Sequence, residues 1–409
     1  MNLYLDHAAS TPLSEGVKSV IRDSLELYGN PSSLHKLGVA TEKHIKESRR
    51  LICEALNINE RELVFTSGGT EANNLAILGS VVNKSRGRYI TSKIEHPSVL
   101  NTFQALSKSG NEVMFLSVDS NGIVDIDELS NSLNDETVLV SIMFVNNETG
   151  AIQPIEKIGK LIYQYNKDHK TNIRFHVDAV QAFGKFPINV DACHITLMSI
   201  SAHKINGIKG IGALYVNNSA QLKPILHGGQ QEYMLRPGTE NIIGILSFAK
   251  ATKDAYERMI SNFQYVTLVK ETLAARLLGS DENNFREQEN DTVFINGKLD
   301  ADFSPYILNV SFLGVKAEVL LHSLEMKQIY VATGSACSSK KKEYSHVLIA
   351  NHLGEDRIES AIRLSFGPDL DIENMKFAAD EILKTANDLR LIMNKSDRFR
   401  KLNKNKKRI

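Results

Sequence analysis

The chain has 409 residues, which is enough for one large or two medium domains and too many for a small scaffold held together by disulfides. Its 42% of hydrophobic and 23% of charged residues are typical of a folded globular protein and exclude a mostly disordered chain. Lys plus Arg equals Asp plus Glu, at 48 each, so the formal net charge is zero.

That balance hides a basic C-terminal end. Residues 394–409 contain eight Lys or Arg against Asp397 alone, so this tail carries a net charge of +7 and the rest of the chain carries −7. Such a charge block usually forms a flexible, solvated end, and contact with RNA or an acidic partner is the alternative. The charge block alone identifies no partner, and we predict no direct nucleic-acid binding.

The sequence has no feature of a membrane or secretory protein. Apolar stretches such as 242–249 fall far short of the roughly 20 residues that a membrane-spanning helix needs. The first residues form neither a basic nor an apolar leader segment. We therefore expect a cytoplasmic protein with no membrane association.

Three cysteines, Cys53, Cys193 and Cys337, are too few for a disulfide framework, and none lies in a Cys-x-x-Cys pair. This predicts a reduced compartment and no zinc ribbon. Cys53 and Cys193 belong to apolar runs in which a small thiol packs well, so both are predicted to be core residues.

Between residues 62 and 216, short β-rich runs alternate with helical patterns, as in a mostly parallel sheet with crossover helices. The predicted strands are 62–66, 89–91, 112–118, 138–145, 173–177, 195–200 and 212–216. The predicted helices between them include 71–82, 99–109 and 155–169. We expect a large α/β domain over residues 14–248.

After residue 244 the pattern changes. It predicts a long helical segment at 246–278, strands at 307–312 and 361–366, and a closing helix at 372–393. We expect these elements to form a smaller α+β domain over residues 249–393, completed by residues 1–13, with residues 394–409 as the tail.

Three loops that follow predicted strands contain residues capable of chemistry, and ligands bind at the carboxyl ends of strands in such sheets. Residues 66–71 combine two glycines with the start of a predicted helix. The free N–H groups and the dipole of a helix start favour phosphate binding. A capped helix without a ligand has the same sequence pattern. Lys204 follows the strand at 195–200 and could form a Schiff base if its pKa were lowered, whereas most lysines are solvated.

The third loop begins with Asp178, which directly follows the strand at 173–177 and needs a cationic partner. A pyridinium nitrogen would serve, although an aspartate that caps a helix is the commoner case. A phosphate-binding loop, a lysine and an aspartate at three strand ends are together what pyridoxal 5′-phosphate requires. This combination predicts a pyridoxal-phosphate site.

Nine segments extend this pattern along nearly the whole chain. In chain order they are 4–12 (YLDHAASTP), 29–33 (GNPSS), 66–71 (TSGGTE), 95–96 (EH), 145–150 (VNNETG), 177–178 (VD), 201–204 (SAHK), 236–241 (RPGTEN) and 334–338 (GSACS). The sequence resembles the NifS/IscS-like cysteine desulfurases, which are fold-type I pyridoxal-phosphate enzymes within the class-V aminotransferase family. The resemblance implies a large α/β domain with a mostly parallel sheet and a smaller α+β domain.

The resemblance also implies roles for the residues at the ring of the cofactor. Lys204 would bond to pyridoxal phosphate as a Schiff base and later move the substrate Cα proton. Asp178 would pair with the pyridine nitrogen, Gln181 would hydrogen-bond the ring hydroxyl, and His96 would stack over the ring and shuttle protons.

Further roles concern the phosphate, the substrate and the subunits. The resemblance implies that the phosphate is held by Gly69, Thr70, Ser201 and His203. Thr239 would reach the phosphate of a neighbouring subunit, which implies a homodimer with shared active sites. Arg363 would bind the substrate carboxylate, with Asn30 as a second contact, and Asn147 would touch both cofactor and substrate.

The sulfur chemistry implied by the resemblance depends on Cys337. Small residues surround it and Lys340, Lys341 and Lys342 follow, which favours an exposed thiolate. This thiolate would attack the sulfur of L-cysteine, giving L-alanine and a persulfide that passes to an iron–sulfur scaffold or a tRNA-thiolation enzyme. We expect no resident metal, only a cluster that Cys337 could share transiently with a scaffold.

Two other hypotheses compete with a cysteine desulfurase. A related class-V enzyme, such as a selenocysteine lyase or an aminotransferase, would share the cofactor site without the sulfur relay, and Cys337 discriminates between the two. A non-catalytic sulfur-trafficking or RNA-associated scaffold would use the basic tail, but it would have no need for Lys204, Asp178 and His96.

Overall fold

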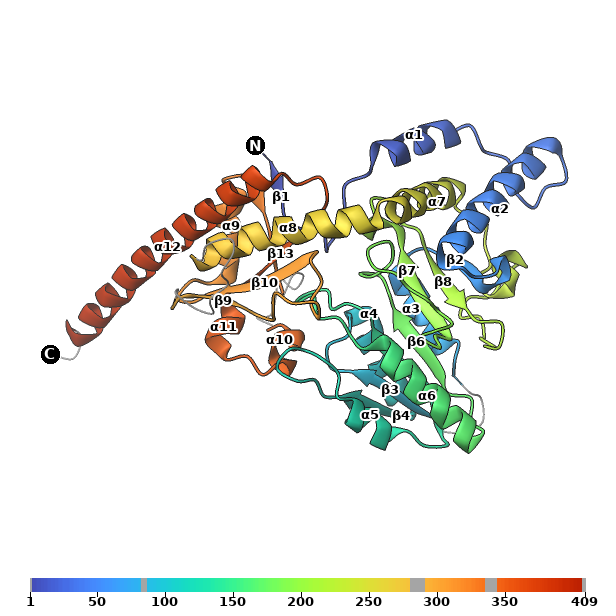
Figure 1. The fold of residues 1–409 in the computed structure, drawn as a ribbon, viewed down its shortest axis with the longest axis horizontal. Coiled ribbons are helices and arrows are strands. Elements are labelled where there is room, and N and C mark those ends of the chain that lie inside the picture. Colours follow the sequence, from blue (N-terminus) through green and yellow to red (C-terminus); the bar gives the residue numbers. More distant parts are fainter. Residues whose placement is uncertain (1, 82–86, 280–290, 335–343, 407–409) are drawn as a thin grey trace.

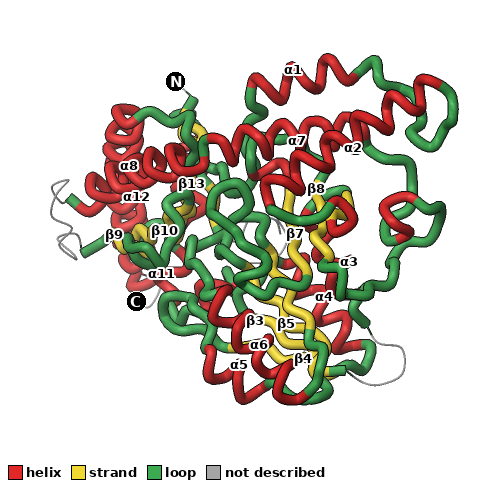
Figure 2. The backbone as a smooth tube through the Cα atoms, turned by 45° about the vertical axis from the view of Figure 1, so that its right-hand side comes forward, coloured by secondary structure: helices red, strands yellow, loops and turns green. Residues whose placement is uncertain are grey.

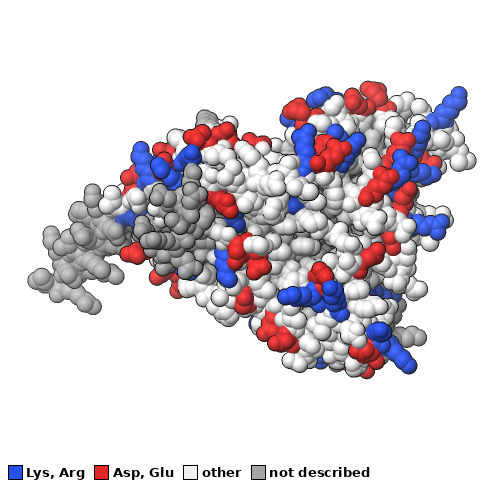
Figure 3. Space-filling view, viewed as in Figure 1, with Lys and Arg blue, Asp and Glu red and all other residues white. Residues whose placement is uncertain are grey.

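The computed structural model describes residues 2–81, 87–279, 291–334 and 344–406. Figure 1 shows two parts of the molecule side by side. One part contains a large sheet and its helices, and the other contains a smaller sheet flanked by long helices. None of the helices in these residues combines the length and the apolar character needed to cross a membrane. Figure 3 shows that Lys and Arg are interspersed with Asp and Glu over the visible face.

The large sheet has seven strands in the order β2-β8-β7-β6-β5-β3-β4. In that order they are Leu63–Thr66, Gly212–Val216, Leu197–Ser201, Arg174–Asp178, Thr137–Met143, Arg88–Ser92 and Glu112–Leu116. Only β8 runs against the others, because it pairs antiparallel with both β2 and β7. The predicted mostly parallel sheet is therefore confirmed, and all seven predicted strands are present.

Helices cover both faces of this sheet (Figure 2). The helices of this part of the chain are α1 (Glu15–Ser24), α2 (Lys36–Leu56), α3 (Gly69–Leu78), α4 (Pro97–Lys108), α5 (Ile126–Ser132), α6 (Ile155–His169) and α7 (Ile242–Glu257), of which α1 packs against α7. Short 3₁₀ turns lie at η1 (Glu60–Glu62), η2 (Ala202–Lys204) and η3 (Gln231–Met234).

Two apolar clusters show how the strands are buried on both faces. In β2, Val64 packs in the cluster that contains residues of α3 and α4, whereas the next residue, Phe65, packs in the cluster that contains residues of α2 and α6. Successive side chains of a strand point to opposite faces, so a sheet covered on both sides needs a nearly continuous apolar run. This is why the strands were visible as short apolar runs in the sequence.

The smaller part contains a four-stranded antiparallel sheet in the order β12-β13-β10-β9. These strands are Ala332–Thr333, Ala361–Ser365, Ile307–Phe312 and Val293–Ile295. Its helices are α8 (Met259–Leu278), α9 (Ala317–Glu325), α10 (His346–Ala350), α11 (Glu355–Glu359) and α12 (Ile372–Lys406). The helical segment expected at 246–278 is two helices, because Arg258 leaves the helical conformation between α7 and α8.

The N-terminal segment joins the smaller part to the large sheet. Strand β1 (Leu3–Tyr4) pairs in parallel with β11 (Ile329–Tyr330), and Asp6 forms a bridge with Ser365 of β13. The chain then passes Lys204, whose amine contacts the carbonyl oxygens of Ala8 and Ala9. Helix α12 extends from the body toward the C-terminus (Figure 1). The predicted boundaries at 14–248 and 249–393 stay predictions.

Candidate active site

A cavity of about 390 Å³ lies at the carboxyl ends of β6 and β7, beside the start of α3. Ten of the predicted site residues line it: Gly69, Thr70, His96, Asn147, Asp178, Gln181, Ser201, His203, Lys204 and Arg363. They come from both parts of the chain, since Arg363 belongs to β13 of the smaller sheet. The fold thus brings together residues that are nearly 300 positions apart in the sequence.

The start of α3 provides an anion site on one wall. Gly68 has a φ of 153°, which favours glycine, and a Cβ on Gly69 would lie 2.7 Å from the Val180 side chain. These two glycines let the chain turn directly from β2 into α3. The first N–H groups of the helix have no acceptor within it, so they and the helix dipole attract a phosphate.

Ser201 and His203 lie next to this helix start. In the described part of the chain, the buried Ser201 Oγ has no hydrogen-bond partner, so it is a donor held ready for a ligand. Burial, together with the nearby charge of Lys204, lowers the pKa of His203 to about 4, so the imidazole is neutral at physiological pH. Both side chains can hydrogen-bond an anion placed against α3.

Asp178 ends β6 with its carboxylate facing the cavity and is only 5% exposed. Its Oδ1 accepts from the backbone N–H of Val180 at 3.0 Å, and its Oδ2 accepts from Asn73 Nδ2 at 2.8 Å. Both donors are neutral, so this buried carboxylate has no cation among its hydrogen-bond partners. A protonated ring nitrogen in the cavity would supply that cation.

Lys204 closes the short turn η2 that follows β7. Its Nζ donates to the carbonyl oxygens of Ala8 at 2.5 Å and Ala9 at 2.8 Å, which holds the amine at the cavity wall. Burial lowers the pKa of Lys204 to about 8, and Arg363 acts in the same direction while Asp6 and Asp178 oppose it. A fraction of the amine is therefore neutral near physiological pH, as a nucleophile or base requires.

Arg363 faces the cavity from the side of the smaller sheet. It donates from Nη1 to the carbonyl oxygen of Asn147 at 2.9 Å and from Nη2 to Asp6 Oδ1 at 2.7 Å. Its buried Nε has no partner among the described residues. Two of its N–H groups thus fix the guanidinium in place, and its Nε–H is among the donors that remain for a ligand carboxylate.

Gln181 and Lys185 form a pair beside the N-terminal segment. Gln181 Nε2 donates to the carbonyl oxygen of Ala8 at 2.8 Å, and its Oε1 accepts from Lys185 Nζ at 3.4 Å. Burial lowers the pKa of Lys185 to about 7. The second N–H of the Gln181 amide is left available, and this side chain lines the cavity.

Three predicted site residues are not found in the cavity of this single chain. Asn30 is exposed, and its Oδ1 accepts from the backbone N–H of Ser32 at 2.9 Å. Thr239 is exposed in the segment between η3 and α7. Cys337 lies outside the described residues. The roles of these three residues stay predictions.

Asn73 and Ser98 also line the cavity, and neither is among the site residues predicted from the sequence. The only signal in the sequence is a polar Asn73 between the apolar residues Ala72 and Leu75 of α3, where it is 1% exposed. A buried polar side chain in an apolar helix face needs a specific partner. Its partner, Asp178, lies 105 positions away in the chain, so the contact could not be inferred from spacing.

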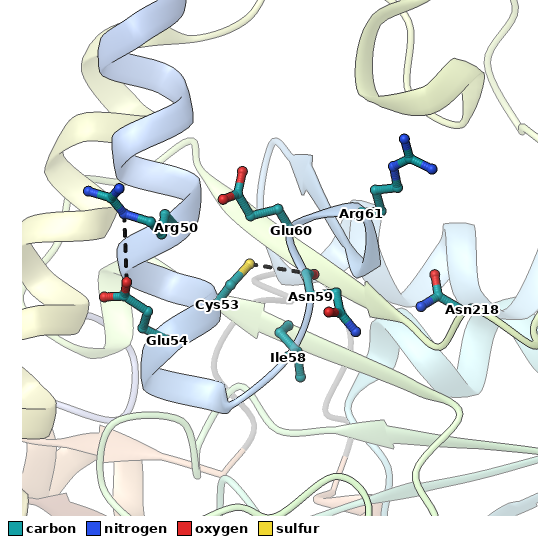
Figure 4. Close-up of a pocket in the computed structure, with 8 residues that line it drawn as sticks. All are labelled: Arg50, Cys53, Glu54, Ile58, Asn59, Glu60, Arg61 and Asn218. Atoms are coloured by element: carbon teal, nitrogen blue, oxygen red, sulfur yellow. Dashed lines mark hydrogen bonds and ion pairs between the residues drawn. The ribbon is translucent and has the colours of Figure 1, made fainter.

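A second cavity, of about 730 Å³, opens at the C-terminal end of α2 and contains Cys53 (Figure 4). The Cys53 thiol points toward the carbonyl oxygen of Asn59, at 3.7 Å from Sγ. Burial raises the pKa of Cys53 to about 12, so the group stays protonated and is a poor nucleophile. Cys53 is a packing residue, as predicted.

The model of the family described as "Aminotransferase class-V" matches residues 3–377. The chain belongs to this family. Its relatives include "Putative cysteine desulfurase IscS 1" of Bacillus subtilis (strain 168), which is 41% identical over 93% of this chain and 97% of the relative. "Cysteine desulfurase IscS" of Dictyoglomus turgidum is 38% identical over 95% of this chain and 96% of the relative.

Comparison with solved structures indicates the same family. A solved structure of a "NIFS-LIKE PROTEIN" superimposes with a TM-score of 0.86 at 32% identity, and the match covers 95% of this chain and all of the other. The predicted resemblance to NifS/IscS-like proteins is therefore confirmed, together with the fold-type I architecture. As in other members of the class-V aminotransferase family, the cofactor is pyridoxal 5′-phosphate.

The donors and acceptors of the cavity fit this cofactor. The start of α3 and the unpartnered Ser201 Oγ suit its phosphate, the carboxylate of Asp178 suits a protonated pyridine nitrogen, and the Lys204 amine suits its aldehyde. Among the described residues, no group of three His, Cys, Asp or Glu side chains is placed to hold a metal ion.

Proposed function

We propose that this class-V enzyme is a cysteine desulfurase, which takes the sulfur from L-cysteine, releases L-alanine and passes the sulfur to an acceptor. The observation that carries the proposal is one cavity lined by the start of α3, Asp178 and Lys204. The IscS and NifS names of its relatives support the choice of L-cysteine as substrate.

Bound pyridoxal phosphate supplies an acceptor for the electron pair that remains when the substrate Cα–H bond breaks. Lys204 would bond to the cofactor and then move this proton, because its amine is partly neutral at physiological pH. Asp178 would keep the pyridine nitrogen protonated. His96 would lie over the ring and exchange protons with the substrate.

The remaining cavity residues would orient the cofactor and the substrate. Gly69, Thr70, Ser201 and His203 would bind the phosphate, and Gln181 would donate to the ring hydroxyl. Arg363 would bind the substrate carboxylate through its unpartnered Nε, with the neighbouring Asn147 contacting cofactor and substrate. Asn30 would be a second carboxylate contact.

Cys337 would be the sulfur acceptor of the enzyme itself. Its thiolate attacks the sulfur of L-cysteine, an S–S bond forms, and the Cβ–S bond breaks. The carbon keeps that electron pair and gains a proton, so L-alanine is released and Cys337 carries a persulfide. The basic Lys340, Lys341 and Lys342 that follow in the sequence favour the thiolate.

We further propose that the enzyme is a cytoplasmic homodimer. Thr239 is exposed in the segment between η3 and α7, where it is free to reach the phosphate of the other subunit. The acceptor of the persulfide sulfur would be an iron–sulfur scaffold or a tRNA-thiolation enzyme. Size-exclusion chromatography with light scattering measures the subunit number, and a monomeric holoenzyme would contradict the shared site.

A Cys337→Ala variant tests the function. It is expected to keep the visible absorption of the bound cofactor and to lose sulfide release from L-cysteine down to the background rate, because the attacking thiolate is gone. The assay is the release of sulfide and alanine by the purified holoenzyme. Wild-type protein is expected to release one alanine for each sulfur.

Cys193→Ala is the matched control, because it removes another thiol, one whose pKa is raised by burial. Sulfide release is expected to be unchanged in this variant. A Cys337→Ala variant that still released sulfide at the wild-type rate would contradict the persulfide relay and favour a selenocysteine lyase. Wild-type holoenzyme that released no alanine from L-cysteine would contradict the substrate.

An Arg363→Ala variant tests the substrate carboxylate contact. A hydrogen bond to a charged group contributes about 1.5–3 kcal/mol to the free energy of binding. The KM for L-cysteine is therefore expected to rise about 10-fold to 100-fold. Steady-state kinetics of alanine release measure this change. Arg276→Ala, which removes an exposed arginine paired with Asp380 at 2.7 Å, is expected to leave the KM unchanged. An unchanged KM in Arg363→Ala would contradict the contact.

A further inference from the structure

A chain of four hydrogen-bonded side chains connects Asp178 to His96 along one wall of the cavity. Asn73 Nδ2 lies 2.8 Å from Asp178 Oδ2 and 2.8 Å from Ser98 Oγ. Ser98 Oγ lies 2.8 Å from His96 Nδ1, and the backbone N–H of Ser98 donates to the same nitrogen at 3.1 Å. These side chains come from β6, α3 and the start of α4.

The chemistry of Asp178 fixes the direction of every hydrogen bond in the chain. An ionised carboxylate only accepts, so the Asn73 amide must present its NH₂ group to Asp178. The same nitrogen faces Ser98 Oγ, so the hydroxyl accepts there and its single proton points to His96 Nδ1. With two donors directed at it, His96 Nδ1 is an acceptor and carries no proton.

We propose that Asn73 and Ser98 are positioning residues, which hold His96 as the neutral tautomer with its proton on Nε2. The consequence for the reaction, which depends on the proposed function, is that His96 acts as a hydrogen-bond and proton donor through Nε2. It cannot take a second proton at Nδ1 without losing the hydrogen bond from Ser98.

The groups around His96 also favour the neutral ring. Burial lowers the pKa of His96, and positive charge on Lys204 of η2 or on His346 of α10 acts in the same direction, whereas Asp178 on β6 opposes this. The helix that begins at His96 leaves this ring at its N-terminal end, where the helix dipole disfavours a cation. Asn73 and Ser98 add a specific preference between the two neutral tautomers, which these charges alone do not provide.

The tautomer can be read directly in the holoenzyme labelled with ¹⁵N-histidine. We expect the ring of His96 to show a protonated Nε2 and an unprotonated Nδ1, with the resonances assigned by their loss in a His96→Asn variant. A protonated Nδ1 in the wild-type protein would overturn the proposal. This readout needs no turnover, so it is independent of whether L-cysteine is the substrate.

Two substitutions at Ser98 test the hydroxyl itself. Ser98→Ala removes one donor to Nδ1 and is expected to raise the pKa of His96 by about 0.5 to 1 pH unit, given the usual contribution of one hydrogen bond. The acid limb of the pH profile for alanine release should move up by the same amount, because the neutral ring is lost as the pH falls. Ser98→Thr keeps the hydroxyl and is expected to restore the wild-type resonances and profile.

The two measurements distinguish a failure of the positioning role from a failure of the proposed function. Identical ¹⁵N resonances in wild type and Ser98→Ala would contradict a positioning role for Ser98, whatever the activity of the variant. Wild-type resonances with the expected tautomer, but without release of alanine from L-cysteine, would support the positioning role and contradict the proposed function instead.

Discussion

A Lys204→Ala variant is expected to lose alanine release from L-cysteine by at least about 100-fold, the lower end of what a positioned general base contributes. Lys204 is the only amine among the described residues that line the cavity. Two backbone carbonyl oxygens, those of Ala8 and Ala9, hold this amine at the cavity wall. The variant is therefore expected to lose both covalent attachment of pyridoxal phosphate and proton transfer.

The pH dependence of cofactor attachment provides a second test of the same residue. Burial lowers the pKa of Lys204 to about 8, so the neutral, nucleophilic fraction of the amine rises as the pH increases through 8. Covalent attachment of pyridoxal phosphate to the cofactor-free protein is expected to speed up over the same range. Borohydride reduction followed by mass spectrometry of the Lys204 peptide measures it. An attachment rate that stayed low until pH 10 would show an ordinary, solvated lysine.

Lys253→Ala is the matched control. Lys253 is exposed on α7, and its Nζ lies 3.8 Å from Glu257 Oε1. It removes one lysine without touching the cavity, so alanine release and cofactor attachment are both expected to be unchanged. Circular dichroism of both variants checks that their folds are intact. A folded Lys204→Ala variant with wild-type activity would contradict the assignment of the cavity as the active site.

The fold and most of the cavity could be predicted from the sequence because their signals are local. Strands buried on both faces appear as short apolar runs, and the ligand-binding ends of these strands are marked by glycines, Asp178 and Lys204 directly after them. The parallel arrangement then brings those ends to one edge of the sheet. The resemblance to a family added Arg363, which belongs to a different sheet and has no local signal.

Other features depend on contacts between distant segments and have no such signal. No glycine or proline marks the break at Arg258 between α7 and α8. The hydrogen bonds from Asn73 to Asp178 and Ser98 link three separate elements. At η3, the left-handed residues Glu232 and Tyr233 would be unfavourable on local preferences alone, so tertiary contacts must hold them.

The main tertiary contact at η3 is a buried ion pair between Arg49 of α2 and Glu232. Arg49 Nη2 lies 2.5 Å from Glu232 Oε1, and the two side chains are only 8% and 4% exposed. Glu232 Oε2 also accepts from the backbone N–H of Phe65 in β2 at 2.8 Å. The guanidinium lies over the ring of Phe65, with 4.6 Å between Arg49 Cζ and the ring centroid. This pair ties the strained turn before Thr239 to the large sheet.

A Glu232→Ala variant is expected to lower the free energy of unfolding by about 3–5 kcal/mol, because it leaves the buried charge of Arg49 without a partner. The N–H of Phe65 would lose its acceptor as well. Urea unfolding of the holoenzyme, followed by circular dichroism, measures the change. Glu54→Ala is the matched control, because the Arg50–Glu54 pair is exposed at 59% and 63% and should contribute no more than about 1 kcal/mol.

A double variant, Arg49→Leu with Glu232→Leu, distinguishes the contribution of the ion pair to stability from the cost of leaving the charge of Arg49 buried without a partner. Replacing both members of a buried ion pair by apolar residues is often neutral, so the double variant is expected to recover most of the stability lost in Glu232→Ala. Part of the loss should remain, because leucine at position 232 cannot accept from Phe65 and must still adopt the left-handed φ of 46°. A double variant less stable than Glu232→Ala would show instead that the ion pair itself, and not the unpaired arginine, sets the stability of this turn.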